Sequence, residues 1–135
     1  MASNDIPVGY QRVYRAPTGR APKLTSQIRS LKPTDLAVCT VVKAELLFGA
    51  LKSARRSENL ASVRRFLEPF ECYPFDDLAC DTYAELRVHL ERAGTPIGPN
   101  DLLIAAIALA RDCAVVTANI REFERVPGLR VELWG

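Results

Sequence analysis

Apolar residues follow two different spacings along the chain, and the two spacings alternate. Residues 36–42 and 113–117 are short, almost continuous apolar runs, which predict strands buried on both faces of a sheet. Residues 72–75 predict a shorter strand, whose Pro74 favours an edge position, and residues 129–133 predict a last strand. Helical spacing between these segments predicts amphipathic helices. Such alternation is typical of an α/β fold with a mostly parallel sheet and helices on both faces.

Four helices are expected after residue 42. Gly94 stands where the C-cap of the third helix belongs, and Asn100 is a favourable N-cap for the fourth. The fourth helix runs from Asp101 to about Arg111 and is apolar almost all round, as expected of a buried helix. The inward residues expected of the first three helices are, in order, Ala44, Leu47, Phe48 and Leu51; Leu60, Val63, Phe66 and Leu67; and Tyr83, Leu86 and Leu90.

The N-terminal part of the chain lacks a clear apolar strand. Three alternating residues give a weak strand signal, and Pro7 weakens it further because proline cannot donate to a sheet. Those residues are Ile6, Val8 and Tyr10. We therefore expect residues 1–19 to form an aberrant or disordered segment and residues 20–135 to form a single α/β domain.

Composition indicates an ordinary globular protein. The chain has 135 residues, 48% of them hydrophobic and 25% charged, with a formal net charge of +2. The charge is uneven, because residues 1–32 hold six Lys or Arg residues against one acid. A basic arm of this kind suits nucleic acid, and a poorly formed segment is the alternative. No apolar run is long enough for a membrane span and no secretory signal is recognisable, so we expect a cytoplasmic protein without a membrane partner.

The sulfur and imidazole side chains exclude several kinds of chemistry. Cys39, Cys72, Cys80 and Cys113 form no Cys-x-x-Cys pair, so four buried reduced thiols are favoured over a disulfide or zinc framework. His89 is the single histidine and lies in the middle of a predicted helix, which disfavours a Ser-His-Asp relay. No Gly-rich phosphate loop is present. Two alternatives are left, carboxylate chemistry or no catalytic chemistry.

Oxygen-bearing side chains follow three of the predicted strands. Glu45 lies in the first turn of the helix after one strand, Asp101 opens the apolar helix, and Asn119 follows the strand 113–117. In open α/β sheets the site lies outside the carboxyl ends of the strands, so these groups can converge there. Such oxygens suit Mg²⁺. The alternatives are that Glu45 and Asp101 favour helix N-termini and that Asn119 makes a turn.

Several motifs resemble those of a known family. They are Ala-Glu-Leu-Leu-Phe-Gly-Ala at 44–50, Gly-Thr-Pro-Ile-Gly-Pro-Asn-Asp-Leu-Leu-Ile-Ala-Ala at 94–106, Val-Thr-Ala-Asn-Ile-Arg-Glu-Phe at 116–123 and Val-Pro-Gly-Leu at 126–129. Together they resemble PIN-domain ribonucleases, and more narrowly VapC-type toxins of toxin–antitoxin pairs. The resemblance implies a three-layer α/β/α sandwich and an endoribonuclease that depends on Mg²⁺ or Mn²⁺. It also implies a homodimer, a cognate antitoxin and an RNA substrate, with tRNA as one candidate.

The resemblance also assigns roles to individual residues. Glu45 and Asp101 match the second and third acidic positions of the family, and Asn119 falls at the fourth, which is often Asp. These three are the expected catalytic and metal-binding residues. Glu122 is a candidate extra member, and Thr117 matches the small polar residue after the strand.

Basic residues just beyond the Glu45 helix are candidates for phosphate contacts. Lys52, Arg55 and Arg56 follow that helix in the sequence. Clustered carboxylates repel RNA, so a metal ion and nearby cations must offset their charge. The alternative is an ordinary solvated helix end.

The chain departs from the family at its first motif. The family begins with an apolar strand ending in Leu-Asp-Thr-Asn, which supplies the first metal-binding Asp, and nothing similar stands here. The only early acid is Asp5, which is a candidate replacement, and the first strand is expected to be degenerate or missing. The alternative function is therefore a catalytically disabled remnant that only binds its antitoxin.

A shift of reading frame accounts for the missing motif. If the codons of residues 4–13 are read one base forward, they permit Met-Ile-Tyr-Leu-Leu-Asp-Thr-Asn-Val, and a compensating shift near residues 19–20 restores the present frame. We expect the DNA sequence of the gene to carry codons compatible with that reading. Sequencing the gene checks this, and codons that cannot encode the shifted peptide rule the hypothesis out.

Overall fold

The centre of the computed structural model, which describes residue 6, residues 10–17 and residues 33–134, is a parallel sheet. Five strands lie in the order β3-β2-β1-β4-β5, and each pairing between neighbours is parallel. The strands are β1 (Arg12–Arg15), β2 (Leu36–Cys39), β3 (Glu71–Tyr73), β4 (Ala114–Thr117) and β5 (Val131–Leu133). The parallel sheet and the edge position of the strand before Pro74 are thus confirmed.

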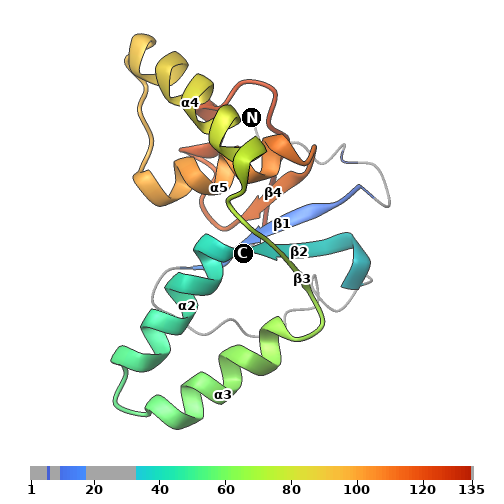
Figure 1. Ribbon diagram of the computed structural model, residues 1–135, viewed down its shortest axis with the longest axis vertical. Coiled ribbons are helices and arrows are strands. Elements are labelled where there is room, and N and C mark those ends of the chain that lie inside the picture. Colours follow the sequence, from blue (N-terminus) through green and yellow to red (C-terminus); the bar gives the residue numbers. More distant parts are fainter. Residues whose placement is uncertain (1–5, 7–9, 18–32, 135) are drawn as a thin grey trace.

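Helices cover both faces of this sheet (Figure 1). One face carries a helical hairpin of α2 (Thr40–Lys52) and α3 (Arg56–Leu67), and the other carries α4 (Asp77–Arg92) and α5 (Pro99–Ala110). Two short 3₁₀ turns complete the described elements, Pro33–Asp35 before β2 and Phe123–Arg125 after β4. The expected three-layer α/β/α sandwich is confirmed.

The central strand is β1, and its sequence is Arg-Val-Tyr-Arg. Val13 has no exposed surface and Tyr14 is 8% exposed, so these two residues supply the apolar part of the strand. The expectation of a missing first strand is corrected: a strand is present, later in the chain than the alternation that starts at Ile6, and its degeneracy lies in its two arginines. Within residues 1–19, Arg12–Arg15 therefore belongs to the sheet, whereas Val8 and Asp5 lie outside the described residues.

Arginines are accommodated in β1 because both stand at its ends and both have acidic partners. Arg12 is buried at the amino end, where its Nε lies 3.2 Å from Glu132 Oε1 and its Nη1 donates to the Tyr10 carbonyl at 2.9 Å. A buried guanidinium needs such partners, since burying an unpaired charge is very costly. Arg15 stands at the carboxyl end, and its partners belong to the site described below.

The helix α2 begins earlier than its pattern predicted. The strand β2 ends at Cys39, so the last residues of the predicted strand, up to Val42, form the first turn of the helix. Val42, Leu46 and Ala50 face the core at spacings of four residues. The predicted inward stripe is wrong, because Phe48 is 65% exposed. Ala44 and Leu51, its neighbours on the same face of the helix, are exposed as well.

The reason lies in the phase of the helix. Val42 lies in the first turn of α2, just after the buried strand β2, and is itself buried. Its position fixes which residues of α2 face the sheet. Leu47 is the one member of the predicted stripe that packs against the core, at its margin. In α3 the predicted stripe is confirmed, with Val63 and Phe66 buried.

The ends of α4 and α5 test two further predictions. Gly94 has a φ of +71°, and its N–H bonds the Glu91 carbonyl at 3.1 Å, which confirms it as the residue that terminates α4. The helix α5 is buried as predicted. Its N-cap is Gly98, with Pro99 as first helical residue, so the expected cap at Asn100 is wrong. Proline suits that first position because its missing N–H would have no partner there.

The four cysteines are all free, so no disulfide links the described elements. Cys39 and Cys113 are buried, and burial raises the pKa of each thiol to about 11. The expectation of four buried thiols is corrected for Cys72, which is half-buried, and for Cys80, which is exposed. No helix within the described ranges is long and apolar enough to cross a membrane.

Replacing Val13 by alanine tests the central position of β1. Truncating a fully buried side chain by two carbon atoms leaves a cavity, so we expect Val13→Ala to lower the free energy of unfolding by about 1–3 kcal/mol. Urea denaturation followed by circular dichroism measures the change. The matched control is Val88→Ala on α4, where the valine is 48% exposed and the expected change is within about 0.5 kcal/mol. Equal losses in the two variants would contradict the position of β1.

Candidate functional site

The carboxyl ends of β1 and β4 lie side by side at one edge of the sheet, where Arg15 stands opposite Thr117. A cavity of about 230 Å³ opens at this edge. Its lining residues are Arg15, Ala16, Pro17, Asp101, Thr117, Ala118, Asn119 and Phe123. Two of the three side chains predicted to converge, Asp101 and Asn119, therefore share one cavity.

Arg15 joins this cavity to the third predicted side chain, Glu45. Its Nε donates to Asp101 Oδ1 at 3.0 Å and its Nη2 donates to Glu45 Oε2 at 3.2 Å, while its Nη1 contacts the other Glu45 oxygen. The side chains of Arg15, Glu45 and Asp101 are only 11%, 15% and 18% exposed. Three elements far apart in the sequence, namely β1, α2 and α5, thus meet at one guanidinium.

The guanidinium keeps its charge in this position. Burial alone would lower the pKa of Arg15, but its hydrogen bond with Glu45 and the charge of Asp101 outweigh that effect and raise the pKa. Paired, charge-assisted hydrogen bonds of this kind are stronger than neutral ones. Arg15 therefore acts as a fixed positive charge between the two carboxylates.

Glu122 enters the site from the loop after β4. Its Oε1 accepts a hydrogen bond from the Gly98 N–H at 2.8 Å, at the start of α5. A Cβ on Gly98 would lie 3.4 Å from both Glu122 carboxylate oxygens, in ordinary van der Waals contact, so the carboxylate lies directly against this residue. The structure thus brings the candidate extra residue to the same helix end as Asp101.

Asp101 and Glu122 form a coupled pair of carboxyl groups. Burial raises the pKa of Asp101 to about 6, and its hydrogen bond with Glu122 adds to that rise. The same hydrogen bond lowers the pKa of Glu122. A carboxyl with a raised pKa in a cavity is a mark of functional sites.

Asn119 and Thr117 shape the wall of the cavity on the β4 side. The Thr117 hydroxyl accepts from the Asn119 N–H at 3.1 Å, and Asn119 Oδ1 accepts from the Arg121 N–H at 3.2 Å. Asn119 therefore makes the turn that was the alternative to its functional role, and it is exposed at the cavity as well.

Two residues of the site were missed in the sequence. Arg15 gave no signal of a role, because Val13 and Tyr14 alone are too short an apolar run to reveal a central strand. Asn100 was interpreted as a helix cap, whereas its Nδ2 donates to Glu45 Oε2 at 2.9 Å. The position of Asn100 directly before Asp101 is the signal that could have suggested it.

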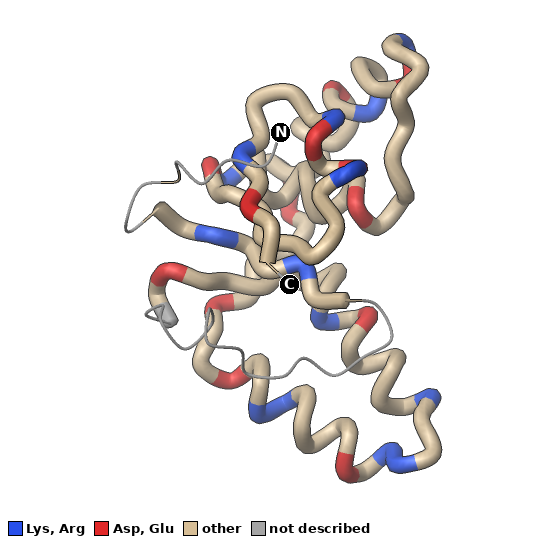
Figure 2. The backbone as a smooth tube through the Cα atoms, turned by 180° about the vertical axis from the view of Figure 1, so that it is seen from behind, with Lys and Arg blue, Asp and Glu red and all other residues tan. Residues whose placement is uncertain are grey.

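The predicted phosphate-binding residues lie away from the cavity. Lys52 is seven residues after Glu45 on the same helix, which corresponds to about 10 Å along the helix axis. Figure 2 shows basic positions at the connection between α2 and α3, far from the sheet. There Lys52 lies over the Phe48 ring, and Arg55 pairs with Glu58 at 3.3 Å. The structure therefore does not bring these residues, or Arg56 beside them, to the acidic site.

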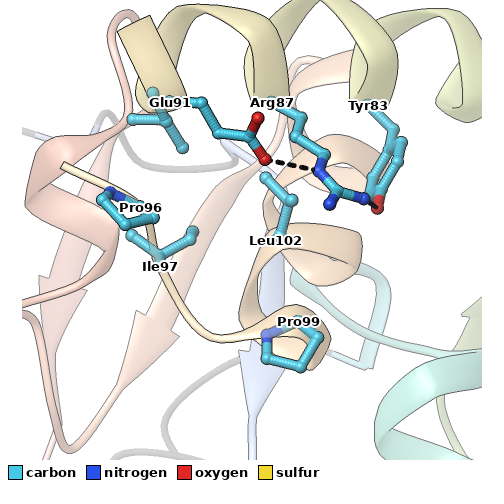
Figure 3. Close-up of a pocket in the computed structure, with 8 residues that line it drawn as sticks. Tyr83, Arg87, Glu91, Pro96, Ile97, Pro99 and Leu102 are labelled. Atoms are coloured by element: carbon cyan, nitrogen blue, oxygen red, sulfur yellow. Dashed lines mark hydrogen bonds and ion pairs between the residues drawn. The ribbon is translucent and has the colours of Figure 1, made fainter. Parts of the chain in front are cut away.

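A second cavity, of about 270 Å³, lies between α4 and α5 (Figure 3). Within it Arg87 pairs with Glu91 at 2.8 Å and donates to the Tyr83 hydroxyl at 3.0 Å. The rest of its lining is apolar, with Ile97 and Leu102 facing the two polar side chains. None of the predicted site residues lines this cavity, so the acidic edge of the sheet is the candidate site.

The donor chemistry of the acidic edge fits a divalent cation such as Mg²⁺ or Mn²⁺. Carboxylate oxygens of Glu45, Asp101 and Glu122 and the amide oxygen of Asn119 are hard ligands of the kind these ions prefer. In the described part of the chain, however, no three acidic, histidine or cysteine side chains are grouped closely enough to hold an ion. Arg15 stands between Glu45 and Asp101 instead.

Comparisons with known proteins agree with this fold. The PIN domain family model matches residues 19–129. The tRNA(fMet)-specific endonuclease VapC of Salmonella typhimurium is 40% identical over 105 residues, which are 78% of this chain and 80% of that protein. Ribonuclease VapC2 of Rickettsia felis is 41% identical over 103 residues, 76% of this chain and 77% of that protein.

Solved structures give the same result. The DNA-bound VapBC of Salmonella typhimurium superimposes with a TM-score of 0.84 at 33% identity, covering 93% of this chain and 99% of that chain. VapBC2 of Rickettsia felis, bound to a DNA fragment from its promoter, gives a TM-score of 0.80 at 32% identity, covering 92% and 98%.

Proposed function

The chain belongs to the PIN domain family, and on that premise we propose that it is an endoribonuclease of the VapC type, the toxin of a toxin–antitoxin pair. The observation that carries the proposal is that Asp101 and Asn119 line one cavity at the carboxyl edge of the sheet, where Arg15 contacts both Asp101 and Glu45. This edge is where open α/β sheets bind their substrates. The proposed substrate is RNA, and tRNA is the class to test first, because two relatives are named as tRNA(fMet)-specific endonucleases.

We assign a separate role to each residue of the site. Glu45 and Asp101 would hold a divalent ion from two different helices, with Asn119 as a further oxygen ligand. Such an ion supplies charge neutralisation at the scissile phosphate and an acidified water. Glu122, whose carboxylate accepts from the Gly98 N–H, would add negative charge at the start of the helix that carries Asp101. Asn100 orients Glu45 through its side-chain amide.

A cognate antitoxin is the proposed protein partner. Structural neighbours were solved as VapBC assemblies, which supports a partner of this kind. The exposed apolar face of α2, formed by Phe48 and Leu51, is a suitable surface, since side chains of this size are enriched in the centres of protein interfaces. A homodimer in the cytoplasm completes the proposal, and sedimentation velocity of the purified chain tests the dimer.

The second candidate function is a disabled remnant that binds its antitoxin without cleaving RNA. The observation that favours it is Arg15, a cation at the end of the strand where the family resemblance calls for an acid. Both candidates keep the antitoxin surface, so RNA cleavage separates them.

Replacing Asp101 by asparagine tests the nuclease function. With tRNA and saturating Mn²⁺, the unaltered chain is expected to cleave, and Asp101→Asn is expected to slow cleavage on the order of 100-fold or more by removing a charged ligand. Gel electrophoresis of labelled tRNA measures the rate. The matched control is Asp77→Asn, another acid in the first turn of a helix, which lies on α4 outside the site and should leave the rate unchanged.

Two results would contradict the nuclease proposal. Absence of cleavage by the unaltered chain at every Mn²⁺ concentration would leave the remnant as the function. Cleavage that Asp101→Asn leaves intact would assign the activity to another site or to a contaminant.

Replacing Phe48 by serine tests the antitoxin surface. Phe48→Ser removes the largest exposed apolar side chain of α2, and we expect the Kd for the antitoxin encoded beside this gene to rise about tenfold or more. Isothermal titration calorimetry measures it. The control, Leu78→Ser, alters a side chain on α4 that is 57% exposed and should leave the Kd within about twofold. The same Kd in both variants would place the antitoxin elsewhere.

A further inference from the structure

We propose that Arg15 is a built-in counter-ion that competes with the divalent cation for Glu45 and Asp101, so that the ion binds only when the guanidinium is displaced. The inference rests on the proposed function, because that function requires an ion between these carboxylates. It adds a residue of the opposite charge, at a position for which the family resemblance supplies an acid.

The location of Arg15 is fixed by the sheet. It is the last residue of the central strand, hydrogen-bonded in register with Thr117 of β4 at the mouth of the cavity. Its backbone therefore has little freedom, and its side chain extends between the helices that carry Glu45 and Asp101. Among the described residues, no other basic side chain lines the cavity.

The carboxylate oxygens that a metal ion would need are already engaged. Both oxygens of Glu45 contact the Arg15 guanidinium, and Glu45 Oε2 also accepts from Asn100 Nδ2 at 2.9 Å. Asp101 Oδ1 accepts from Arg15 Nε at 3.0 Å. An incoming ion therefore has to break hydrogen bonds to a charged donor before it can take these oxygens.

Arg15 cannot release Glu45 and Asp101 to the metal ion by losing its own proton. A guanidinium stays charged in proteins, so the side chain must move as an ion. The unit charges also favour its present position, since one guanidinium cancels half of the negative charge of Glu45 and Asp101 together. Without it, two half-buried carboxylates lose their shared cationic partner, and their two negative charges are what a divalent cation neutralises.

Arg12 provides a matched comparison within the same strand. It is also an arginine of β1, it is 8% exposed, and it also pairs with an acid, Glu132, at 3.2 Å. It stands three residues from Arg15, at the opposite end of β1, which is about 10 Å along an extended chain. Removing Arg12 therefore breaks a buried ion pair without changing the candidate metal site.

Titration with Mn²⁺ alone tests the competition. Isothermal titration calorimetry is carried out on the unaltered chain, Arg15→Gln and Arg12→Gln at neutral pH, without RNA. We expect Arg15→Gln to lower the Kd for Mn²⁺ about 10- to 100-fold, the factor that corresponds to a hydrogen bond with a charged group. Arg12→Gln should bind Mn²⁺ within about twofold of the unaltered chain. Equal or weaker binding by Arg15→Gln, or an equal gain in Arg12→Gln, would overturn the proposal.

Thermal unfolding covers the case in which Arg15→Gln is unstable. Without metal this variant leaves carboxylates unpaired, so its melting temperature should fall below that of the unaltered chain. Saturating Mn²⁺ should restore the variant, because an ion that binds only the folded state stabilises it, and should shift the unaltered chain much less. A variant that Mn²⁺ does not rescue would refute the competition.

The failures of the two proposals are distinguishable. If the unaltered chain cleaves tRNA while Arg15→Gln gains no Mn²⁺ affinity, the nuclease function holds and the competition is wrong. If Arg15→Gln gains affinity and no variant cleaves tRNA, the competition holds and the nuclease function is wrong.

Discussion

The ion-pair network of Arg15 is the interaction on which the arrangement of the site depends. One guanidinium contacts Glu45 on α2 and Asp101 on α5, helices that cover opposite faces of the sheet (Figure 1). Two carboxylates in such a buried place need a cation between them, because their mutual repulsion and desolvation would otherwise oppose folding. In this chain the side chain of Arg15 supplies that cation. The guanidinium therefore compensates one of the two negative charges, and any metal ion has to replace a partner that is already present.

The same residue links the chemistry of the site to the stability of the sheet. The strand that carries Arg15 is central, with β2 on one side and β4 on the other, so its backbone is paired along both edges. Only Val13 and Tyr14 contribute apolar side chains to it. A strand with so few apolar residues is stabilised by its neighbours more than by its own side chains. The strands on either side of it provide hydrogen-bond partners for its backbone N–H and C=O groups. The arginines at its two ends are compatible with that position because each meets an acid there.

The helices separate the functional surfaces of the molecule. The first part of α2 contributes Glu45 to the buried site, and its outer face presents Phe48 to solvent. A partner on that outer face would contact the same helix that holds a carboxylate of the site. The basic residues at the far end of the hairpin between α2 and α3 lie beyond both surfaces (Figure 2). A long RNA would have to extend along this hairpin to reach them from the acidic edge.

The sequence by itself determined the α/β class, the order of the helices and strands after residue 35 and the family, because periodicity and contiguous motifs are local properties of the chain. It also singled out Asp101 and Glu122, whose motifs place them next to a helix start and a strand end. Only the tertiary structure decided which residues fill the central strand, which face of α2 is buried, and that Asn100 contacts Glu45 rather than capping its helix. The role of Arg15 was likewise decided only by the tertiary structure. These features depend on contacts between segments 30 to 86 residues apart, and no local pattern records such contacts.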